Sequence, residues 1–489
     1  MYKNTRIKKI QEIIDREKHN PFNIVEIPWE DDLKSMNVYK IPLHLLVYNK
    51  YNGRILSRTK SLEKQNKNID EFSDEGKKLI EHLLWESNPE RNKNTKKSIA
   101  TSGQQKIGII TRDGIIIDGN RRVMLLNDMQ NGGRLFSKYN EKKYDYFKAV
   151  VLPVSLEENP LEIEKLETSF QMGEDQKLGY NATEKYLKAS ELYKRINPEK
   201  QYRSDDYNKS TISKIAEWMG EDDSEVVKYL NTMLIMDEYL YYLGYDGIYT
   251  QLDGREDQFL FLTKWLNLFY GENSKKAFDG YADSDVDDLK ELAFDYIRIK
   301  NNYDGKEFRN LADGMRENHF FGDKDIWERF FYEHQKIKTS IGEEPEIDFN
   351  SNNLSKHLDD RDNQYFRKSK LGNETSAFLD NLFESKTRIG YNKASGAPEK
   401  LVKRAIDAFS AIKQGHQSFT NSEVQELVES LANQVTDSMV QKSITNLLKH
   451  IIHLLEPIDI NNIQENEAEE VKEQTKIIQK ICYKINKEL

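Results

Sequence analysis

The residues best suited to chemistry stand together in the segment 118–122, which reads Asp-Gly-Asn-Arg-Arg. The β-branched run 115–117 precedes it and predicts a buried strand, and the apolar spacing over 123–126 predicts a helix that begins at Asn120. The first turn of a helix has backbone N–H groups without acceptors, so it attracts an anion. Two arginines there indicate an anion of high charge, such as a triphosphate or nucleic-acid phosphate. The alternative is a solvated arginine pair opening a surface helix.

The neighbouring elements that must position this segment read as a small α/β unit. Strands are predicted at 41–46, 106–111 and 148–154, with a hairpin turn at 112–114 that leads into Ile115. The polar span 57–95 separates the first two strands, and 72–85 inside it has helical spacing. The basic cluster 91–97 reads as a solvated loop, with a contact to a phosphate backbone as the alternative.

The stretch 115–126 resembles the signature of the ParB/sulfiredoxin superfamily: a strand, a glycine turn and a helix that opens with Arg-Arg or His-Arg. Three further ParB-like elements occur in the same order. They are similar to the Asn-Pro-Arg turn, the segment before the second strand and the Glu-Asn-x-Gln-Arg motif, and stand at 49–54, 98–105 and 166–171. The chain departs from the family at Asn120, where ParB has glutamate. Sulfiredoxin has a cysteine at that position, so its chemistry is disfavoured here.

This resemblance implies a nucleotide pocket for CTP or ATP with Mg²⁺. The triphosphate would lie at the start of the helix, and the base or ribose would lie farther along. The nucleotide-binding residues so implied are Gly119, Asn120, Arg121, Arg122, Ser98, Gly103, Gln105 and Arg54. Glu167 would hold the magnesium ion and, with Asp118, would be a catalytic residue.

Three functions stay open on this basis. The first is a ParB-like, DNA-associated nucleotide-binding protein with slow NTP hydrolysis. The second is a nuclease or phosphotransfer enzyme of the same superfamily. The third is a catalytically lapsed interaction protein, and phage defence or a mobile element is a fitting setting for such a chain.

A helix-turn-helix like that of ParB is implied over 210–234, followed by further helices. The acidic residues within 221–225 would repel DNA phosphates at the start of the recognition helix. An acidic first turn is also what the helix dipole favours, so stability alone explains it. The sequence therefore disfavours reading of the DNA major groove by this helix.

Composition sets outer bounds on these functions. The chain has 489 residues and a net charge of -10, so binding to a nucleic-acid backbone would require a local basic patch. One cysteine, Cys482, excludes an internal disulfide and a cysteine-rich zinc site. We expect a cytoplasmic bacterial protein, since neither a signal peptide nor a membrane-spanning run is recognisable.

The predicted fold class is α+β: a small ParB/sulfiredoxin-like α/β domain followed by a large all-α region. The predicted divisions are an N-terminal arm, the nucleotide-binding domain, the helix-turn-helix-like domain, a helical domain, a linker and a C-terminal helical domain, at 1–36, 37–157, 158–250, 251–345, 346–375 and 376–489. Apolar residues over 471–489 follow a short a/d repeat. This coiled-coil-like end would either pair with another copy as a homodimer or cap the helical domain.

Overall fold

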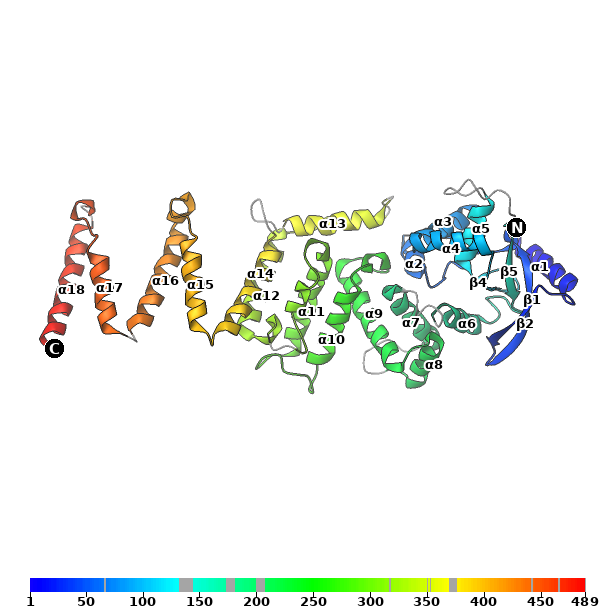
Figure 1. The fold of residues 1–489 in the computed structure, drawn as a ribbon, viewed down its shortest axis with the longest axis horizontal. Coiled ribbons are helices and arrows are strands. Elements are labelled where there is room, and N and C mark those ends of the chain that lie inside the picture. Colours follow the sequence, from blue (N-terminus) through cyan, green and yellow to red (C-terminus); the bar gives the residue numbers. More distant parts are fainter. Residues whose placement is uncertain are drawn as a thin grey trace. The chain divides into compact units, whose positions relative to one another are not determined.

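The computed structural model describes residues 1–65, 67–131, 144–172, 181–198, 207–315, 318–349, 351, 353–368, 376–440, 443–464 and 467–488. The chain divides into two compact units, Met1–Lys393 and Ala394–Leu489. One five-stranded sheet lies in the first part of the chain and helices make up the rest, as the colours of Figure 1 show. The fold is α+β with a large helical region, as the sequence predicts.

Helices cover both faces of the mixed sheet. The elements of this region are α1 Lys3–Glu17, β1 Asn23–Trp29, β2 Asp32–Pro42, α2 Leu56–Lys64, α3 Asp74–Glu86, α4 Pro89–Ser102, β3 Gly108–Ile110, β4 Ile116–Asp118, α5 Asn120–Gln130, β5 Tyr146–Val151 and α6 Pro160–Met172. The strand order is β1-β2-β5-β3-β4, with β3 and β5 parallel and the other neighbours antiparallel.

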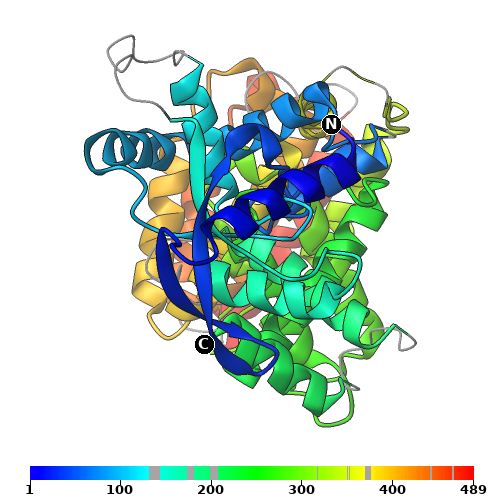
Figure 2. The same ribbon diagram turned by 90° about the vertical axis from the view of Figure 1, so that its right-hand side faces the viewer.

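The two-residue period of the strands sorts their side chains into two cores. Phe147 and Ala149 of β5 join α1, α3, α4 and α5 in one core, whereas Val150 faces the other core with Ile163 and Leu166 of α6. Figure 2 shows α1 crossing the strands on the first of these faces. The loop between β4 and α5 is therefore held between two packed layers.

The predicted boundary at residue 36 is wrong, because the segment after α1 is a hairpin of the sheet. β2 runs across that boundary and ends at Pro42. The predicted first strand at 41–46 therefore overlaps only the end of β2, and most of it is a short 3-10 turn, Leu43–Leu45. Glu30 and Asp31 join β1 to β2, and both have positive φ, 52° and 60°. Two-residue turns of this kind match the twist of hairpin strands and ordinarily contain Asn and Gly. Because an acidic pair stands here instead, the sequence pattern did not indicate a turn.

The rest of the first unit is helical and has an aromatic core. Its helices are α7 Ala182–Ile196, α8 Lys209–Met219, α9 Asp223–Leu243, α10 Glu256–Phe269, α11 Asp283–Arg298, α12 Lys324–Ile341, α13 Leu354–Lys368 and α14 Ala377–Ala394. The rings of Trp265 and Phe308 stack with centroids 5.1 Å apart, and those of Phe321 and Trp327 meet edge to face at 4.9 Å. These four rings lie within the stretch 251–345, which the sequence predicts to be helical.

The predicted linker at 346–375 contains helix α13. Leu354 and Leu358 are buried, and Asp362 accepts a hydrogen bond from Arg298 Nε at 2.7 Å. Apolar residues one helical turn apart stand among many polar ones, so the polar composition concealed the helix. Arg298 is itself buried and its guanidinium lies 4.2 Å from the ring centroid of Tyr365, which fixes α13 to α11.

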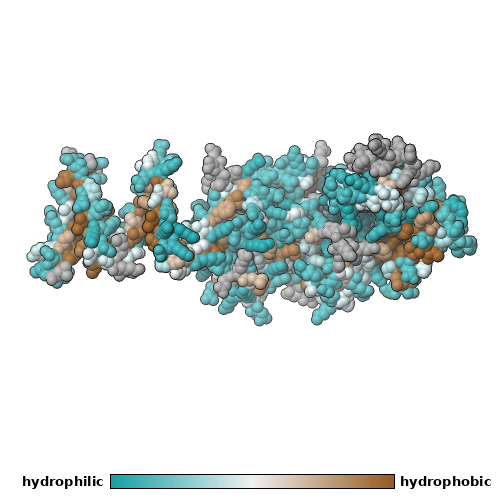
Figure 3. All heavy atoms as spheres, viewed as in Figure 1, coloured by the Kyte–Doolittle hydropathy of each residue, from teal (hydrophilic) through white to brown (hydrophobic). Residues whose placement is uncertain are grey.

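The second unit begins later than residue 376, because α14 belongs to the first unit. It contains α15 Pro398–Ser410, α16 Ser422–Val440, α17 Ile444–Leu455 and α18 Ala468–Glu488. Among its described residues, none is classed as buried. Figure 3 shows apolar side chains in bands along these helices.

Candidate functional site

The turn between β4 and α5 requires glycine. Gly119 caps α5 with φ 115°, a left-handed conformation that residues with a Cβ rarely adopt. A Cβ at this position would also overlap the ring of Phe147 from β5. Since glycine has no side chain, no side-chain cap satisfies the first N–H groups of α5. These backbone N–H groups in the first turn of α5 point outward from the start of the helix.

Asn120 uses its amide to build this turn. Its side chain is buried, Oδ1 accepts from the backbone N–H of Asn49 at 3.0 Å, and Nδ2 donates to the carbonyl of Ile116 at 3.1 Å. An ionised glutamate, the ParB residue at this position, could not donate the second bond. The side chain thus joins α5 to β4 and to the segment after β2.

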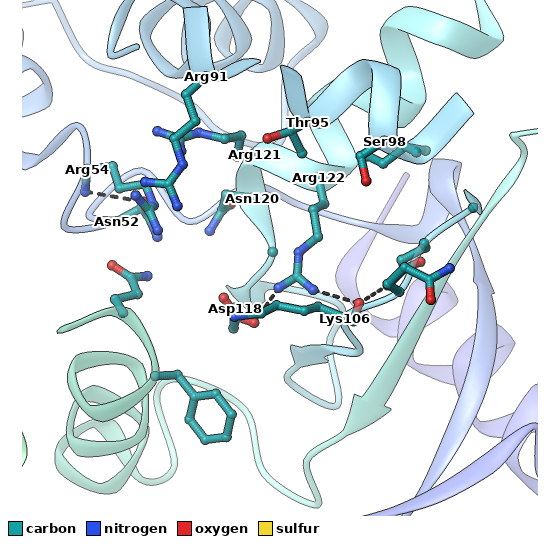
Figure 4. A pocket seen from close by; sticks show the side chains of 17 residues that line it. Asn52, Arg54, Arg91, Thr95, Ser98, Lys106, Asp118, Asn120, Arg121 and Arg122 are labelled. Carbon is teal, nitrogen blue, oxygen red and sulfur yellow. Dashed lines mark hydrogen bonds and ion pairs between the residues drawn. The ribbon is translucent and has the colours of Figure 1, made fainter. Parts of the chain in front are cut away.

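The two arginines of the first turn point in different ways, as Figure 4 shows. Arg122 turns toward the sheet: it forms an ion pair with Asp118 and donates to the carbonyls of Lys106 and Ile107 at 2.6 and 3.2 Å. Arg121 lies with Arg54 and Arg91 on the opposite side of the cavity. Three guanidinium groups gathered in this way concentrate positive charge on one side of the cavity, which favours an anion nearby.

A cavity of about 260 Å³ opens at this turn. Its lining comes from the segment after β2, from α4 and the loop after it, from the start of α5 and from the end of α6: Asn52, Arg54, Arg91, Thr95, Ser98, Ile99, Gly103, Gln104, Gln105, Lys106, Asp118, Gly119, Asn120, Arg121, Arg122, Phe170 and Gln171. All eight residues expected to bind a nucleotide are among them, and so is Asp118. The structure thus brings the eight predicted residues together although they lie up to 68 residues apart in sequence, from Arg54 to Arg122.

Helix α4 presents its polar side to the cavity and is firmly anchored on the other. Lys96 is buried in an ion pair with Asp128 of α5, and Nδ2 of Asn92 donates to the carbonyls of Leu84 and Trp85 at 3.1 and 2.8 Å. The basic cluster 91–97 is therefore helix rather than the predicted solvated loop. Gly103 ends α4 with φ 73°, which leads the chain into the cavity wall.

The charge of this lining is strongly positive. Four arginines and Lys106 face the cavity, whereas Asp118 is the single carboxylate among the described lining residues, and it is paired with Arg122. The whole chain has a net charge of -10. A basic cavity in an acidic protein attracts small anions in preference to a long nucleic-acid backbone, which needs a wide basic surface.

A second, smaller cavity of about 60 Å³ adjoins the first. Arg54, Arg91 and Arg121 line both, and the other residues around it are Arg58, Ser87, Asn88, Asn181 and Glu184. Glu184 is buried and accepts from the backbone N–H and the hydroxyl of Ser57 at 3.0 and 2.6 Å. Burial raises the pKa of the Glu184 carboxyl to about 7, so at neutral pH it opposes an anion only in part.

Glu167 lies behind the cavity wall, contrary to its expected place at the metal. Its Oε1 accepts from the side-chain amides of Asn49, Asn52 and Gln171 at 3.2, 3.3 and 2.9 Å. Its Oε2 lies 3.9 Å from Nζ of Lys188 on α7. Burial raises the pKa of Glu167 to about 7 against the lowering effect of Lys188. Asn52 and Gln171 line the cavity, so their side-chain amides connect Glu167 to it by hydrogen bonds.

No group of three or more His, Cys, Asp or Glu side chains in the described ranges is arranged to hold a metal ion. Magnesium ordinarily keeps several waters and binds through one or two carboxylates together with substrate phosphates. Asp118 is the one carboxylate among the described lining residues, so a magnesium ion here would need phosphate ligands in addition.

Sequence reasoning missed several residues of this cavity. Thr95 and Lys106 carried no motif signal, and Phe170 and Gln171 lay in the motif-like segment 166–171 but were not assigned to the site. Arg91 was noticed in the basic cluster but assigned to solvent. Its helical spacing from Thr95 and Ser98, at four and seven residues, is the pattern that could have placed all three on one face.

The predicted helix-turn-helix region consists of α8 and α9, joined at 220–222. Ser213 donates to Asp223 at 2.7 Å, and Lys185 pairs with Glu221 at 2.8 Å. The acidic start of α9 is thus engaged with neighbouring helices. These contacts give it a structural role.

No family model, no curated protein and no solved structure matches the chain. In the part of the chain that the structure describes, no helix combines the length and apolar character needed to cross a membrane.

Proposed function

We propose that this protein binds a nucleoside triphosphate, with its phosphates at the amino terminus of α5. The gathering of Arg54, Arg91 and Arg121 opposite Arg122 and Lys106 around one cavity carries the proposal. The helix start adds backbone donors and a favourable dipole. The resemblance of 118–122 to the ParB/sulfiredoxin signature supports the same class of ligand, CTP or ATP with Mg²⁺.

Each part of the cavity has a function in this proposal. Arg54, Arg91 and Arg121 neutralise the phosphates, since guanidinium groups form strong charge-assisted bonds to them. Ser98 and Gln105 are exposed at the rim and contact the ribose or base. Asp118 shares a magnesium ion with the phosphates, while Arg122 holds Asp118 in place.

We limit the proposal to binding. Three amides already hold Glu167, and Asp118, which lines the cavity, is paired with Arg122, so neither carboxylate is placed to act as a general base. Association with DNA would use the basic residues of α4 rather than the acidic start of α9. The nucleotide would regulate such a contact by bridging α4 and α5.

Calorimetric titration with the four ribonucleoside triphosphates and Mg²⁺ tests this proposal. We expect one of them to bind, and Arg121→Ala to weaken binding at least tenfold, since a hydrogen bond to a charged group contributes about 1.5–3 kcal/mol. Arg112→Ala is the matched control, because Arg112 belongs to the same domain, pairs with Glu158 and does not line the cavity. The proposal fails if no triphosphate binds, or if Arg121→Ala and Arg112→Ala bind as the wild type does.

A further inference from the structure

The C-terminal unit exposes apolar faces that a protein of this size ordinarily covers. On α16, Leu427, Leu431 and Val435 are 71%, 40% and 51% exposed, and on α18, Ile477 and Ile481 are 44% and 54% exposed. α15 and α17 have apolar faces of the same kind. Amphipathic helices gain their stability by burying such stripes, and large exposed apolar patches mark interaction surfaces.

The charges beside these stripes are separated between two helices. α16 contains Glu423, Glu426, Glu429 and Asp437 and neither lysine nor arginine, so it is wholly acidic, with three of its four acids in its amino-terminal half. The carboxyl-terminal half of α18 carries Lys480, Lys484 and Lys487 beside a single acid, Glu488. These side chains are exposed on both helices. An acidic half-helix and a basic half-helix, each beside an apolar stripe, are complementary surfaces.

The relative direction of α16 and α18 decides whether these two halves can pair within one chain or between two chains. The amino-terminal half of α16 meets the carboxyl-terminal half of α18 only when the helices run antiparallel. Within one chain α16 and α18 run in the same direction, because α17 returns between them (Figure 1). In the opposite, parallel alignment the acids of α16 would lie beside the amino-terminal half of α18, where Glu469, Glu470 and Glu473 outnumber Lys472 and Lys476. A second copy supplies the antiparallel partner.

We infer that the second unit binds a second copy of this chain, with α16 of each copy antiparallel to α18 of the other. A two-fold axis makes the contact reciprocal, so both acidic halves meet both basic halves. The apolar stripes of the four participating helices are then covered, while the charged flanks set the partner and the direction. This pairing is independent of what binds in the cavity of the first unit.

Charge reversal of the full chain tests this inference. One variant carries Glu423→Lys, Glu426→Lys and Glu429→Lys, and the other carries Lys480→Glu, Lys484→Glu and Lys487→Glu. By light scattering we expect the wild type to be dimeric at about 100 µM, where an interface with a Kd of about 1 µM is saturated. Each variant alone should dimerise at least tenfold more weakly, because like charges then face each other. An equimolar mixture should restore the wild-type affinity.

A control variant reverses three exposed acids of the first unit, Glu12, Asp15 and Glu75, and should dimerise as the wild type does. Circular dichroism of every variant shows whether the helices remain formed. A wild type that stays monomeric at this concentration overturns the inference and points to a different protein as the partner. So does a mixture that remains as monomeric as its two components.

Discussion

The sheet region and the C-terminal unit differ in the kind of surface that each leaves exposed to a binding partner. Around the sheet, two cores bury the apolar side chains, and the open feature is a polar cavity lined by arginines. In the C-terminal unit the polar groups face solvent, and the open feature is a set of apolar stripes. We propose a small anion as the partner of the first kind of surface and another protein surface as the partner of the second. The two regions therefore predict opposite responses to the same type of mutation.

Matched leucine truncations should give the largest contrast between them. Leu84 on α3 is fully buried, so Leu84→Ala should lower the free energy of unfolding by about 2–5 kcal/mol. Leu427→Ala should leave that value unchanged. Urea unfolding followed by tryptophan fluorescence measures this, because all five tryptophans precede residue 394.

Leu427→Ala should instead weaken self-association of the full chain, as light scattering measures it. The contrast breaks down if both truncations destabilise the first unit equally. It also breaks down if Leu427→Ala alters neither measurement.

A pair of glycine substitutions tests whether the turn at the cavity is as constrained as its geometry implies. Gly119→Ala should lower the free energy of unfolding by about 2–4 kcal/mol, because it adds left-handed backbone strain and a clash with Phe147. Gly390 on α14 has open space at its Cβ position, so Gly390→Ala should stabilise by about 0.5–1 kcal/mol. Urea unfolding of both variants gives these values. Equal effects would show that the backbone at Gly119 is no more constrained than that at Gly390.

The buried carboxyl of Glu167 should make the free energy of unfolding of the first unit depend on pH, whereas exposed acids should not. Its pKa is raised by burial to about 7, above the ordinary value of 4.5, so the folded state holds this proton more tightly than the unfolded state. Stability is then lost as pH rises from 4.5 through about 7, by up to about 3 kcal/mol.

Glu167→Gln removes this titration, so its loss of stability between pH 5 and pH 8 should be smaller than that of the wild type. Glu426→Gln on the exposed face of α16 should reproduce the wild-type dependence. Urea unfolding at four pH values measures both. Wild-type and Glu167→Gln curves that stay parallel would show that Glu167 does not titrate in this range.

Local pattern predicted the elements around the site well. The β-branched run before Asp118, the glycine after it and the apolar spacing that follows correctly predict β4, the turn and α5. The strands at 106–111 and 148–154 are confirmed within a few residues. The elements that escaped detection include the β1–β2 hairpin, which turns on an acidic pair, and α13, whose apolar residues stand among many charged ones. In both, tertiary packing overrides a weak local signal.

The place of the proposed anion site can be predicted from the sequence alone, because a glycine turn followed by a helix start leaves backbone donors unsatisfied wherever it occurs. The side chains that surround this turn follow from the tertiary structure. It brought Arg54 and Arg91 to Arg121, turned Arg122 onto Asp118 and set Glu167 behind a row of amides. These choices depend on contacts between distant segments, since a side chain's direction follows from what its helix packs against. A linear pattern does not contain that information.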